Sequence, residues 1–260
     1  PPLPPTDQSN YSSAIDHEDT LEQTYLEERD LGMTLGPFTE EQAANVCGCK
    51  PHELCCGALG AREEGDKVRT IHDGTVNNVN HHIRQHTSEK TTAPTLADVV
   101  HAIQACHECH TAAGGADQNI SPTSDEDIVL IKADVTKAHR RIKVVPKDWK
   151  YMTARIKDQV WINTCGTYGI ASAQLYWGRM AALLLRLLYH TFPDLLWAFV
   201  YVDDFLFLVR RKHLHNVGVS CLLWLLSVGC PLSWKKTLIG TTNSWLGYQI
   251  NSLEASVCLT

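Results

Sequence analysis

The sequence predicts an α+β fold built on an antiparallel sheet with helices on one face, and three observations support this prediction. The β-branched run Ile128–Ile131 is typical of a buried strand. The apolar run Trp197–Val209 is divided by Asp203 and Asp204, which predicts a β-hairpin with two carboxylates at its turn. Helix-forming segments follow the first strand and the hairpin. The order is therefore strand, helix, hairpin, helix, strand, as in a split βαβ (ferredoxin-like) sheet.

The part of the chain before this sheet is expected to contain a disordered arm and two helices. Residues 1–35 are acidic and rich in Pro and Ser, with too few apolar residues to offset the entropy lost on folding. Thr39 with Gln42, and Thr95 with Asp98, form capping boxes that predict the starts of two helices. Glycines predict where these helices end, at Gly48 and at Gly114–Gly115.

The remaining elements belong to the predicted sheet. The first strand ends at Ala133–Asp134, and a short helix is expected over Thr136–Arg141. Strong helix formers fill Tyr176–Tyr189, and leucines at helical spacing predict another helix through Leu222–Leu226. A final strand pair is expected around Trp245–Tyr248.

The composition is that of a folded protein with an uneven distribution of charge. The 260 residues are 44% hydrophobic and 20% charged, which is enough apolar material for a packed core. The formal net charge is −6, but residues 1–130 have a net charge of −15 and residues 131–260 a net charge of +9. This asymmetry predicts a polyanionic partner for the second half of the chain.

The sequence indicates an intracellular protein, in the cytoplasm or nucleus, with no membrane span. The most apolar stretch, Met180–Val202, contains Arg186 and Asp194, and an unpaired charge in mid-bilayer is costly. We find no pattern typical of a signal peptide, so the ten cysteines are expected to stay reduced. We regard two metal-like patterns as incidental, the haem-type Cys106–His110 and the zinc-like group Cys47, Cys49, Cys55 and Cys56 with His52.

Adjacent carboxylates within an apolar run need a compensating charge. Two unit charges about 4 Å apart repel by roughly 4 kcal/mol at an effective dielectric constant near 20. A divalent cation removes this cost, and the sheet topology can bring Asp134 beside Asp203 and Asp204 at one edge. Carboxylate oxygens suit Mg²⁺ or Mn²⁺, which hold phosphates. The alternative is an exposed Asp-Asp turn with no role.

Six segments resemble motifs of reverse transcriptases. Tyr201-Val202-Asp203-Asp204 is similar to the polymerase signature of that family. The other segments follow the family's order along the chain, and the likeness covers about Gly65 to Ile250. These segments are Lys67–Asp73 with Asn80, Ala133–His139, Gly166–Ala173, Gly229 with Lys235–Lys236, and Trp245–Tyr248.

The resemblance implies a two-metal nucleotidyltransferase. Asp134 and Asp203 would bind both Mg²⁺ ions (or Mn²⁺), and Asp204 would be a weaker, supporting ligand. Lys236 would protonate the leaving pyrophosphate, because it is a cation that can lose a proton. The other implied contacts are to the deoxynucleoside triphosphate, by Lys67, Arg69, His139 and Gly169, and to the RNA/DNA primer-template, by Tyr201, Val202, Trp245, Leu246 and Gly247.

The resemblance also implies a right-hand polymerase with fingers and palm. Residues 36–127 would be the N-terminal and fingers region, and residues 128–250 the palm, with a fingers insertion at 146–165 and a tail at 251–260. His139 and Gln174 depart from the family, which has an aromatic residue and a proline at these positions. We expect a thumb or RNase H domain to lie on a longer polyprotein.

Three functions agree with these observations. The first is the RNA-directed DNA polymerase (reverse transcriptase) domain of a eukaryotic retrotransposon. The second is a degenerate or truncated relic that binds nucleic acid without turnover, and the acidic first half favours it. The third is an RNA-templated RNA polymerase, which Val202 and the primer-grip likeness disfavour. If the basic second half binds nucleic acid, a chain that starts near Gly65 should bind a primer-template at least as tightly as the full chain.

Overall fold

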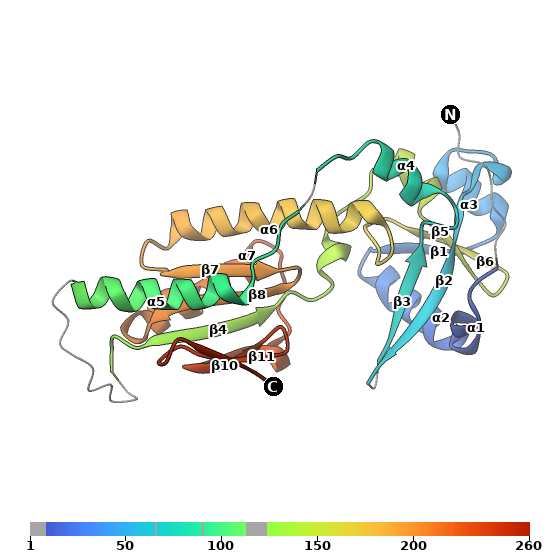
Figure 1. The fold of residues 1–260 in the computed structure, drawn as a ribbon. Coiled ribbons are helices and arrows are strands. Elements are labelled where there is room, and N and C mark those ends of the chain that lie inside the picture. Colours follow the sequence, from blue (N-terminus) through green and yellow to red (C-terminus); the bar gives the residue numbers. More distant parts are fainter. Residues whose placement is uncertain (1–8, 66, 90, 113–123) are drawn as a thin grey trace. The chain divides into compact units, whose positions relative to one another are not determined.

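A computed structural model describes residues 9–65, 67–89, 91–112 and 124–260. The chain forms two compact units, and it passes through both of them twice (Figure 1). Unit 1 contains Pro1–Lys90 and His139–Trp177, and unit 2 contains Thr91–Ala138 and Gly178–Thr260. These units divide the chain differently from the expected domains: residues 91–127 belong to the unit that contains the predicted sheet, and the segment of unit 1 between the two parts of unit 2 is His139–Trp177.

Unit 1 is built on a five-stranded sheet of order β1-β6-β5-β2-β3. All neighbouring strands are antiparallel except β2 and β5, which are parallel. The strands are β1 Thr34–Phe38, β2 Cys56–Glu64, β3 Lys67–Asp73, β5 Thr153–Ile156 and β6 Gln159–Asn163. The helices are α1 Ser12–Asp16, α2 Glu18–Asp30, α3 Glu40–Cys47 and α4 Val79–Gln85, with 3₁₀ turns at Pro51–Glu53, Ala138–Arg141 and Pro146–Tyr151.

The predicted disordered arm is wrong for the residues that form α1, α2 and the start of β1. Leu21 and Tyr25 of α2 are buried against Trp161 of β6, with the Tyr25 and Trp161 rings edge to face at 5.5 Å. Glu28 forms a buried ion pair with Arg140, whose guanidinium also donates to Asn163 Oδ1 at 2.8 Å. A few well-placed apolar residues anchor an otherwise acidic helix. Residues 1–8 of the predicted arm lie outside the described residues.

Both predicted capping boxes are present. The backbone N–H of Gln42 donates to Thr39 Oγ1 at the start of α3, and Gly48 ends this helix with φ +64°. The Asp98 N–H donates to Thr95 Oγ1 at the start of α5, Leu96–Ala112. The expected stop at Gly114–Gly115 lies outside the described residues.

Unit 2 contains the predicted split βαβ sheet. Its four strands have the order β7-β8-β4-β9 and are all antiparallel to their neighbours. They are β4 Ile128–Asp134, β7 Trp197–Tyr201, β8 Asp204–Arg210 and β9 Leu238–Gly240. The connecting helices are α6 Ala171–Thr191, which begins in unit 1, and α7 Ser220–Ser227. The helical segments Arg211–His213 and Leu214–Val219 precede α7, and a 3₁₀ turn covers Trp234–Lys236.

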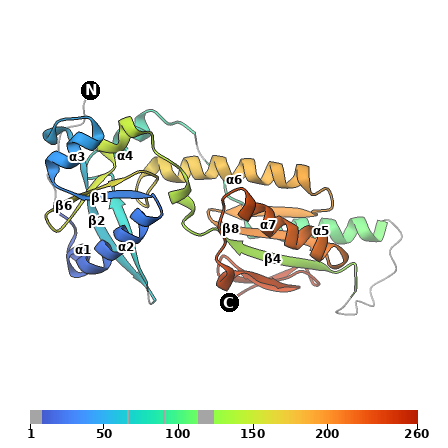
Figure 2. The same cartoon turned by 180° about the vertical axis from the view of Figure 1, so that it is seen from behind.

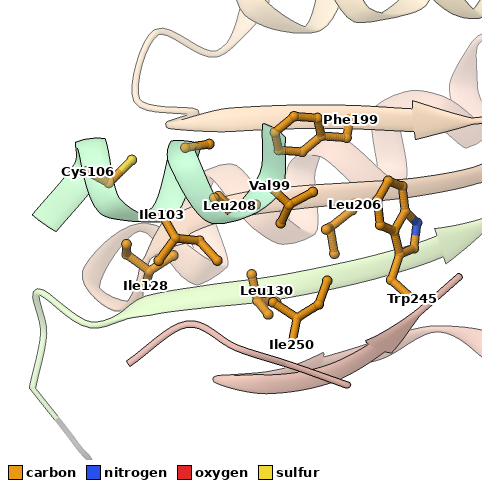
Figure 3. Packing of buried hydrophobic residues seen from close by; sticks show 11 residues of the cluster. Val99, Ile103, Cys106, Ile128, Leu130, Phe199, Leu206, Leu208, Trp245 and Ile250 are labelled. Carbon is orange, nitrogen blue, oxygen red and sulfur yellow. The ribbon is translucent and has the colours of Figure 1, made fainter. Parts of the chain in front are cut away.

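Helices cover both faces of this sheet, so the expectation of helices on one face is wrong. Val99, Ile103 and Cys106 of α5 pack against alternate residues of β4 and β8 that share one face (Figure 3). On the opposite face, Gly218 lies so close to Ile131 that an added Cβ would be 2.5 Å from its Cδ1 atom. Accordingly α5 lies in front of the sheet in Figure 1, and α7 lies in front in Figure 2.

The C-terminal residues form a second sheet in unit 2. Its strands are β10 Thr242–Trp245, β11 Tyr248–Asn251 and β12 Ser256–Leu259, in that order. Leu246 and Gly247 both have positive φ, 53° and 80°, as a type I′ hairpin turn requires. The expected tail at 251–260 is therefore wrong, because β12 pairs along its whole length with β11. The predicted strand pair at 245–248 belongs to this sheet, and the short β9 completes the four-stranded one.

Candidate active site

The register of unit 2 brings the predicted carboxylates to one end of the four-stranded sheet. Asp134 is the last residue of β4 and lies directly opposite Asp204, the first residue of β8. Asp203 occupies the β7–β8 turn, and its carbonyl accepts a hydrogen bond of 2.9 Å from the Val135 N–H. The sequence argument from topology therefore placed the three acids correctly as neighbours.

The β7–β8 turn is tight and strained. Tyr201 pairs with Asp204, so that only Val202 and Asp203 form the loop. Val202 has a φ of +55°, a conformation that β-branched residues rarely adopt. Such strain persists where the surrounding structure fixes the backbone, and it is typical of functional sites.

Two lysines face these acids. Lys236 Nζ donates to Asp134 Oδ2 at 2.8 Å, and Lys132 Nζ lies 3.8 Å from Asp204 Oδ1. The hydrogen bond to Asp134 raises the pKa of Lys236. Burial raises the pKa of Asp204; Lys132 opposes this shift, and the charges of Asp203 and Asp134 add to it.

Lys132 is a site residue that sequence reasoning missed. It precedes Asp134 by two positions on β4, and residues at this spacing share a face of a strand. A charged residue at this position interrupts the apolar run from Ile128 to Ala133. That interruption was the signal that could have identified it.

The segment after α7 holds Lys236 beside β4. The Ser233 N–H donates to the Asp134 carbonyl at 2.9 Å, and the Thr136 N–H donates to the Pro231 carbonyl at 2.8 Å. The Lys236 N–H donates to the Ser233 carbonyl at 2.9 Å, which closes the 3₁₀ turn. Backbone hydrogen bonds therefore fix the turn, and the Lys236 side chain remains 57% exposed.

The donor chemistry of this cluster fits a divalent cation. Asp204 Oδ1 is buried and has no hydrogen-bond partner, which is costly for an ionised carboxylate oxygen. Carboxylate oxygens of Asp134, Asp203 and Asp204 are the ligands that Mg²⁺ and Mn²⁺ prefer. Within the described ranges, no three His, Cys, Asp or Glu side chains already form a metal-binding group. The same holds for the cysteines near His52, and none of the ten cysteines, all of which lie in the described ranges, forms a disulfide bond.

The predicted phosphate-binding residues lie on β3 of unit 1. Lys67 begins this strand, opposite Glu64 of β2. Arg69 Nη2 lies 2.8 Å from Glu64 Oε2, and its guanidinium carbon is 5.1 Å from the centre of the Tyr168 ring. Arg69 is therefore held by an anion and an aromatic face.

Gly169 meets the backbone of β3. It has a φ of +98°, and an added Cβ would lie 2.3 Å from the His72 carbonyl oxygen. Asn80 Nδ2 donates to the Gly169 carbonyl at 2.6 Å, and Asn80 Oδ1 accepts from the Ala171 N–H at 2.7 Å. The glycine is thus required by packing within unit 1, which is a different reason from the predicted contact to the deoxynucleoside triphosphate.

The two departures from the reverse transcriptase pattern contact each other. His139 Nε2 and Gln174 Oε1 are hydrogen-bonded at 2.7 Å. The His139 ring is buried and lies edge to face with Tyr168, at 4.9 Å between ring centres. Gln174 therefore fixes the orientation of the imidazole.

One predicted nucleic-acid contact is buried. Trp245 is fully buried in the core of unit 2, so its side chain is not free to stack on a base. Tyr201 is 40% exposed and lies edge to face with Trp245 at 6.4 Å. Leu246 and Gly247 form the adjacent turn, and Val202 lies in the β7–β8 turn. The buried Trp245 ring packs against the Tyr201 ring and so acts as a packing support for the exposed end of β7.

Comparisons with known proteins give a fold and no sequence family. No family model matches the sequence, and no curated protein matches it. Of the described residues, none form a helix long and apolar enough to cross a bilayer.

Solved structures of foamy virus protease-reverse transcriptases are similar to the whole chain. The foamy viral protease-reverse transcriptase dRH, in complex with double-stranded DNA, has a TM-score of 0.63 at 14% identity. The match covers 100% of this chain and 37% of that one. The complex with an RNA/DNA hybrid has a TM-score of 0.65 at 14% identity, over 99% and 28%. The native prototype foamy virus enzyme has a TM-score of 0.61 at 12% identity, over 96% and 28%. This chain spans well under half the length of these proteins, and its fold is reverse transcriptase-like.

Proposed function

We propose that this chain is the polymerase part of a reverse transcriptase from a retrotransposon. It extends a primer on an RNA or DNA template by adding deoxynucleotides. The observation that supports this most directly is the convergence of Asp134, Asp203 and Asp204 at one end of a split βαβ sheet. The reverse transcriptase-like fold of the whole chain agrees with it. In this proposal unit 2 is the palm and unit 1 is the fingers.

The proposed binding groups are of two kinds. Asp134 and Asp203 would hold Mg²⁺ or Mn²⁺, with Asp204 as the supporting carboxylate. When bound, the metal ions activate the primer 3′ hydroxyl and neutralise the developing charge on the phosphates. In unit 1, Lys67 and Arg69 would bind the triphosphate oxygens, Arg69 with a bidentate fork and Lys67 as a point charge.

Lys236 is the proposed proton donor to the leaving pyrophosphate. Its ammonium group reaches Asp134, so it lies at the carboxylate end of the sheet. A lysine can transfer a proton from Nζ to a phosphate oxygen, whereas an arginine in the same place would keep its charge.

The proposed partner is a primer-template duplex. Double-stranded DNA and an RNA/DNA hybrid are bound by the similar foamy virus proteins. For this chain we propose that Tyr201, Val202, Leu246 and Gly247 contact the primer-template, with Trp245 as their packing support. Gly169 and His139 would lie near the incoming nucleotide.

Primer extension on matched RNA and DNA templates tests this function. The expected result is Mg²⁺-dependent extension with deoxynucleotides on an RNA template, and none by Asp203→Asn. Tight binding of the duplex without any extension would identify the chain as a non-catalytic relic. Extension with ribonucleotides alone would identify an RNA polymerase.

A further inference from the structure

The carboxylate cluster of unit 2 contains two lysines in different environments. Lys132 lies within β4, its side chain is 17% exposed, and its neighbours on both sides are paired strands. Lys236 lies on a 3₁₀ turn, and its side chain is 57% exposed. Both are close enough to neutralise a carboxylate, but only Lys236 donates a hydrogen bond to one.

We propose that Lys236 is a displaceable counter-ion of the metal site. Its ammonium group donates a hydrogen bond to Asp134 Oδ2 until a divalent cation binds this carboxylate, and the cation then displaces the ammonium group. This inference rests on the proposed metal site. It assigns Lys236 a role before the nucleotide arrives, in addition to its proposed proton transfer.

The contact at Asp134 explains why the lysine must leave. A carboxylate oxygen that accepts a hydrogen bond of 2.8 Å from an ammonium has that charge in direct contact. A divalent cation on the same carboxylate would lie only a few ångströms from the ammonium, and like charges at such distances repel strongly. The same carboxylate therefore does not hold both cations in these positions.

The surroundings explain why Lys236 leaves and Lys132 stays. The Asp134 carboxylate is only 10% exposed, but the arriving metal ion would compensate its charge, and the flexible stem of Lys236, 57% exposed, can move the ammonium into water. Lys132 has its stem within a four-stranded sheet and faces Asp204, whose Oδ1 has no hydrogen-bond partner. Moving Lys132 would leave that carboxylate uncompensated.

In the structure, lysines contact two of the three carboxylates. Lys236 holds Asp134, and Lys132 neutralises Asp204. Metal binding would release the Lys236 ammonium at the site where phosphate oxygens later arrive. The positive charge for the phosphates therefore becomes available only after the metal ion has bound.

The test measures Mn²⁺ affinity without nucleotide or nucleic acid. The full chain is titrated with Mn²⁺ at low ionic strength, and free Mn²⁺ is followed by electron paramagnetic resonance. Three variants are compared with the wild type: Lys236→Met, Lys236→Arg and the matched control Lys235→Met. Lys235 is the adjacent residue of the same turn, so its replacement changes the net charge equally.

Lys236→Met should bind Mn²⁺ about three- to tenfold more tightly than the wild type, because the competing cation is gone. Lys236→Arg, which keeps the competing charge, should bind with an affinity close to that of the wild type. Lys235→Met should change the affinity by less than about twofold, because it lacks the direct contact. Thermal denaturation should show an increased Mn²⁺-dependent shift only for Lys236→Met.

The outcomes separate this inference from the proposed function. Equal affinities of Lys236→Met and Lys235→Met, whether both unchanged or both tighter, would overturn the displacement. Weaker Mn²⁺ binding by Lys236→Met would also overturn it, because the lysine would then support the metal. No Mn²⁺ binding by the wild type would contradict the metal site itself and with it the proposed polymerase.

Discussion

Asp203 lies in a two-residue turn whose other member, Val202, has a positive φ. Burial raises the pKa of Asp204, and the charge of Asp203 adds to this shift, so the two carboxylates repel in the folded protein. At the scale of single residues, the site therefore stores unfavourable charge that a metal ion would relieve.

Asp203→Asn should abolish nucleotide addition and leave the fold intact. The substitution removes a proposed metal ligand and one of the repelling charges, so the melting temperature without metal should rise or stay the same. Single-nucleotide primer extension and thermal denaturation measure the two effects. The matched control is Asp194→Asn, an exposed residue of the same unit, which should extend normally. Extension by Asp203→Asn at the wild-type rate would show that the assignment is wrong.

His139 should set the choice of sugar, if it lies under the ribose as the family likeness implies. The hydrogen bond to Gln174 holds the imidazole in place. The likeness implies that the family's aromatic ring at this position blocks the 2′ hydroxyl of a ribonucleotide. A histidine is smaller than that ring and can also hydrogen-bond the 2′ hydroxyl. His139→Tyr should therefore increase the preference for deoxynucleotides, and His139→Ala should relax it by roughly tenfold, about 1.4 kcal/mol. The measurement is kcat/KM for both sugars, and equal ratios in all three proteins would remove His139 from the site.

Sequence reasoning identified the acids correctly as neighbours because strand register follows from local patterns. Asp134 ends a recognisable strand, and Asp203 interrupts a recognisable hairpin. It missed Lys132 because a lone lysine in a strand is usually solvent-facing. It assigned Trp245 to the primer because the motif does not reveal that its ring fills the core between two sheets.

At the scale of elements, α2 is anchored to unit 1 by one buried ion pair. Glu28 and Arg140 are 12% and 4% exposed at the side chain, and Arg140 also donates to Asn163. The residues are far apart in sequence, so no local pattern predicted the contact. The sequence predicted disorder here because it counted acidic residues and could not see their partner.

Arg140→Met should destabilise unit 1 by about 3–5 kcal/mol, because it removes the cation that pairs with the buried Glu28 carboxylate. Urea denaturation measures this loss. Arg29→Met, on α2 itself, is the control. The Arg29 side chain is 43% exposed and, among the described residues, pairs with its neighbour Asp30, so the change should stay within about 0.5 kcal/mol. A loss below about 1 kcal/mol for Arg140→Met would mean that the other contacts of α2, its apolar residues and its ion pairs with Lys157, hold the helix.

A second element, β3, should make stability depend on pH. Burial lowers the pKa of His72 from its usual 6.5 to about 4, so the folded protein keeps this ring neutral. The unfolded chain binds the proton below about pH 6.5, and stability should fall by up to about 1.4 kcal/mol per pH unit between pH 6.5 and 4. His72→Gln should reduce this slope in urea denaturation series. An identical slope in both proteins would contradict the prediction.

At the scale of the whole molecule, the two folded units do not have the opposite net charges that the two halves of the sequence have. Unit 1 contains 14 basic and 18 acidic residues, a net charge of −4, and unit 2 contains 9 and 11, a net charge of −2. The chain enters each unit twice, so acidic and basic segments are mixed. Helices, hairpins and caps were predictable because they depend on neighbours in sequence. The division into two units was not predictable, because it depends on which segments far apart in the sequence share a core.

The expectation that a chain starting at Gly65 binds a primer-template as tightly as the full chain therefore changes. Removing residues 1–64 deletes β1 and β2, and β2 is the strand that joins β3 to β5 in the sheet of unit 1. It also removes Leu21, Tyr25 and Leu59 from the core around Trp161. An unpaired β3 and an exposed core would leave this unit unfolded.

Hydrogen exchange read by mass spectrometry should show this loss segment by segment. Amides of β3, β5 and β6 should lose protection in the truncated chain, whereas those of β4 and β8 in unit 2 should keep it. Removing only residues 1–8 is the control and should leave protection unchanged. Primer-template binding by the chain from Gly65 should weaken, although 13 of the 29 acidic residues and only 3 of the 23 basic residues are deleted. If the truncated chain binds as tightly as the full chain and protects β5 and β6, net charge governs binding, and the first 64 residues are dispensable for the fold.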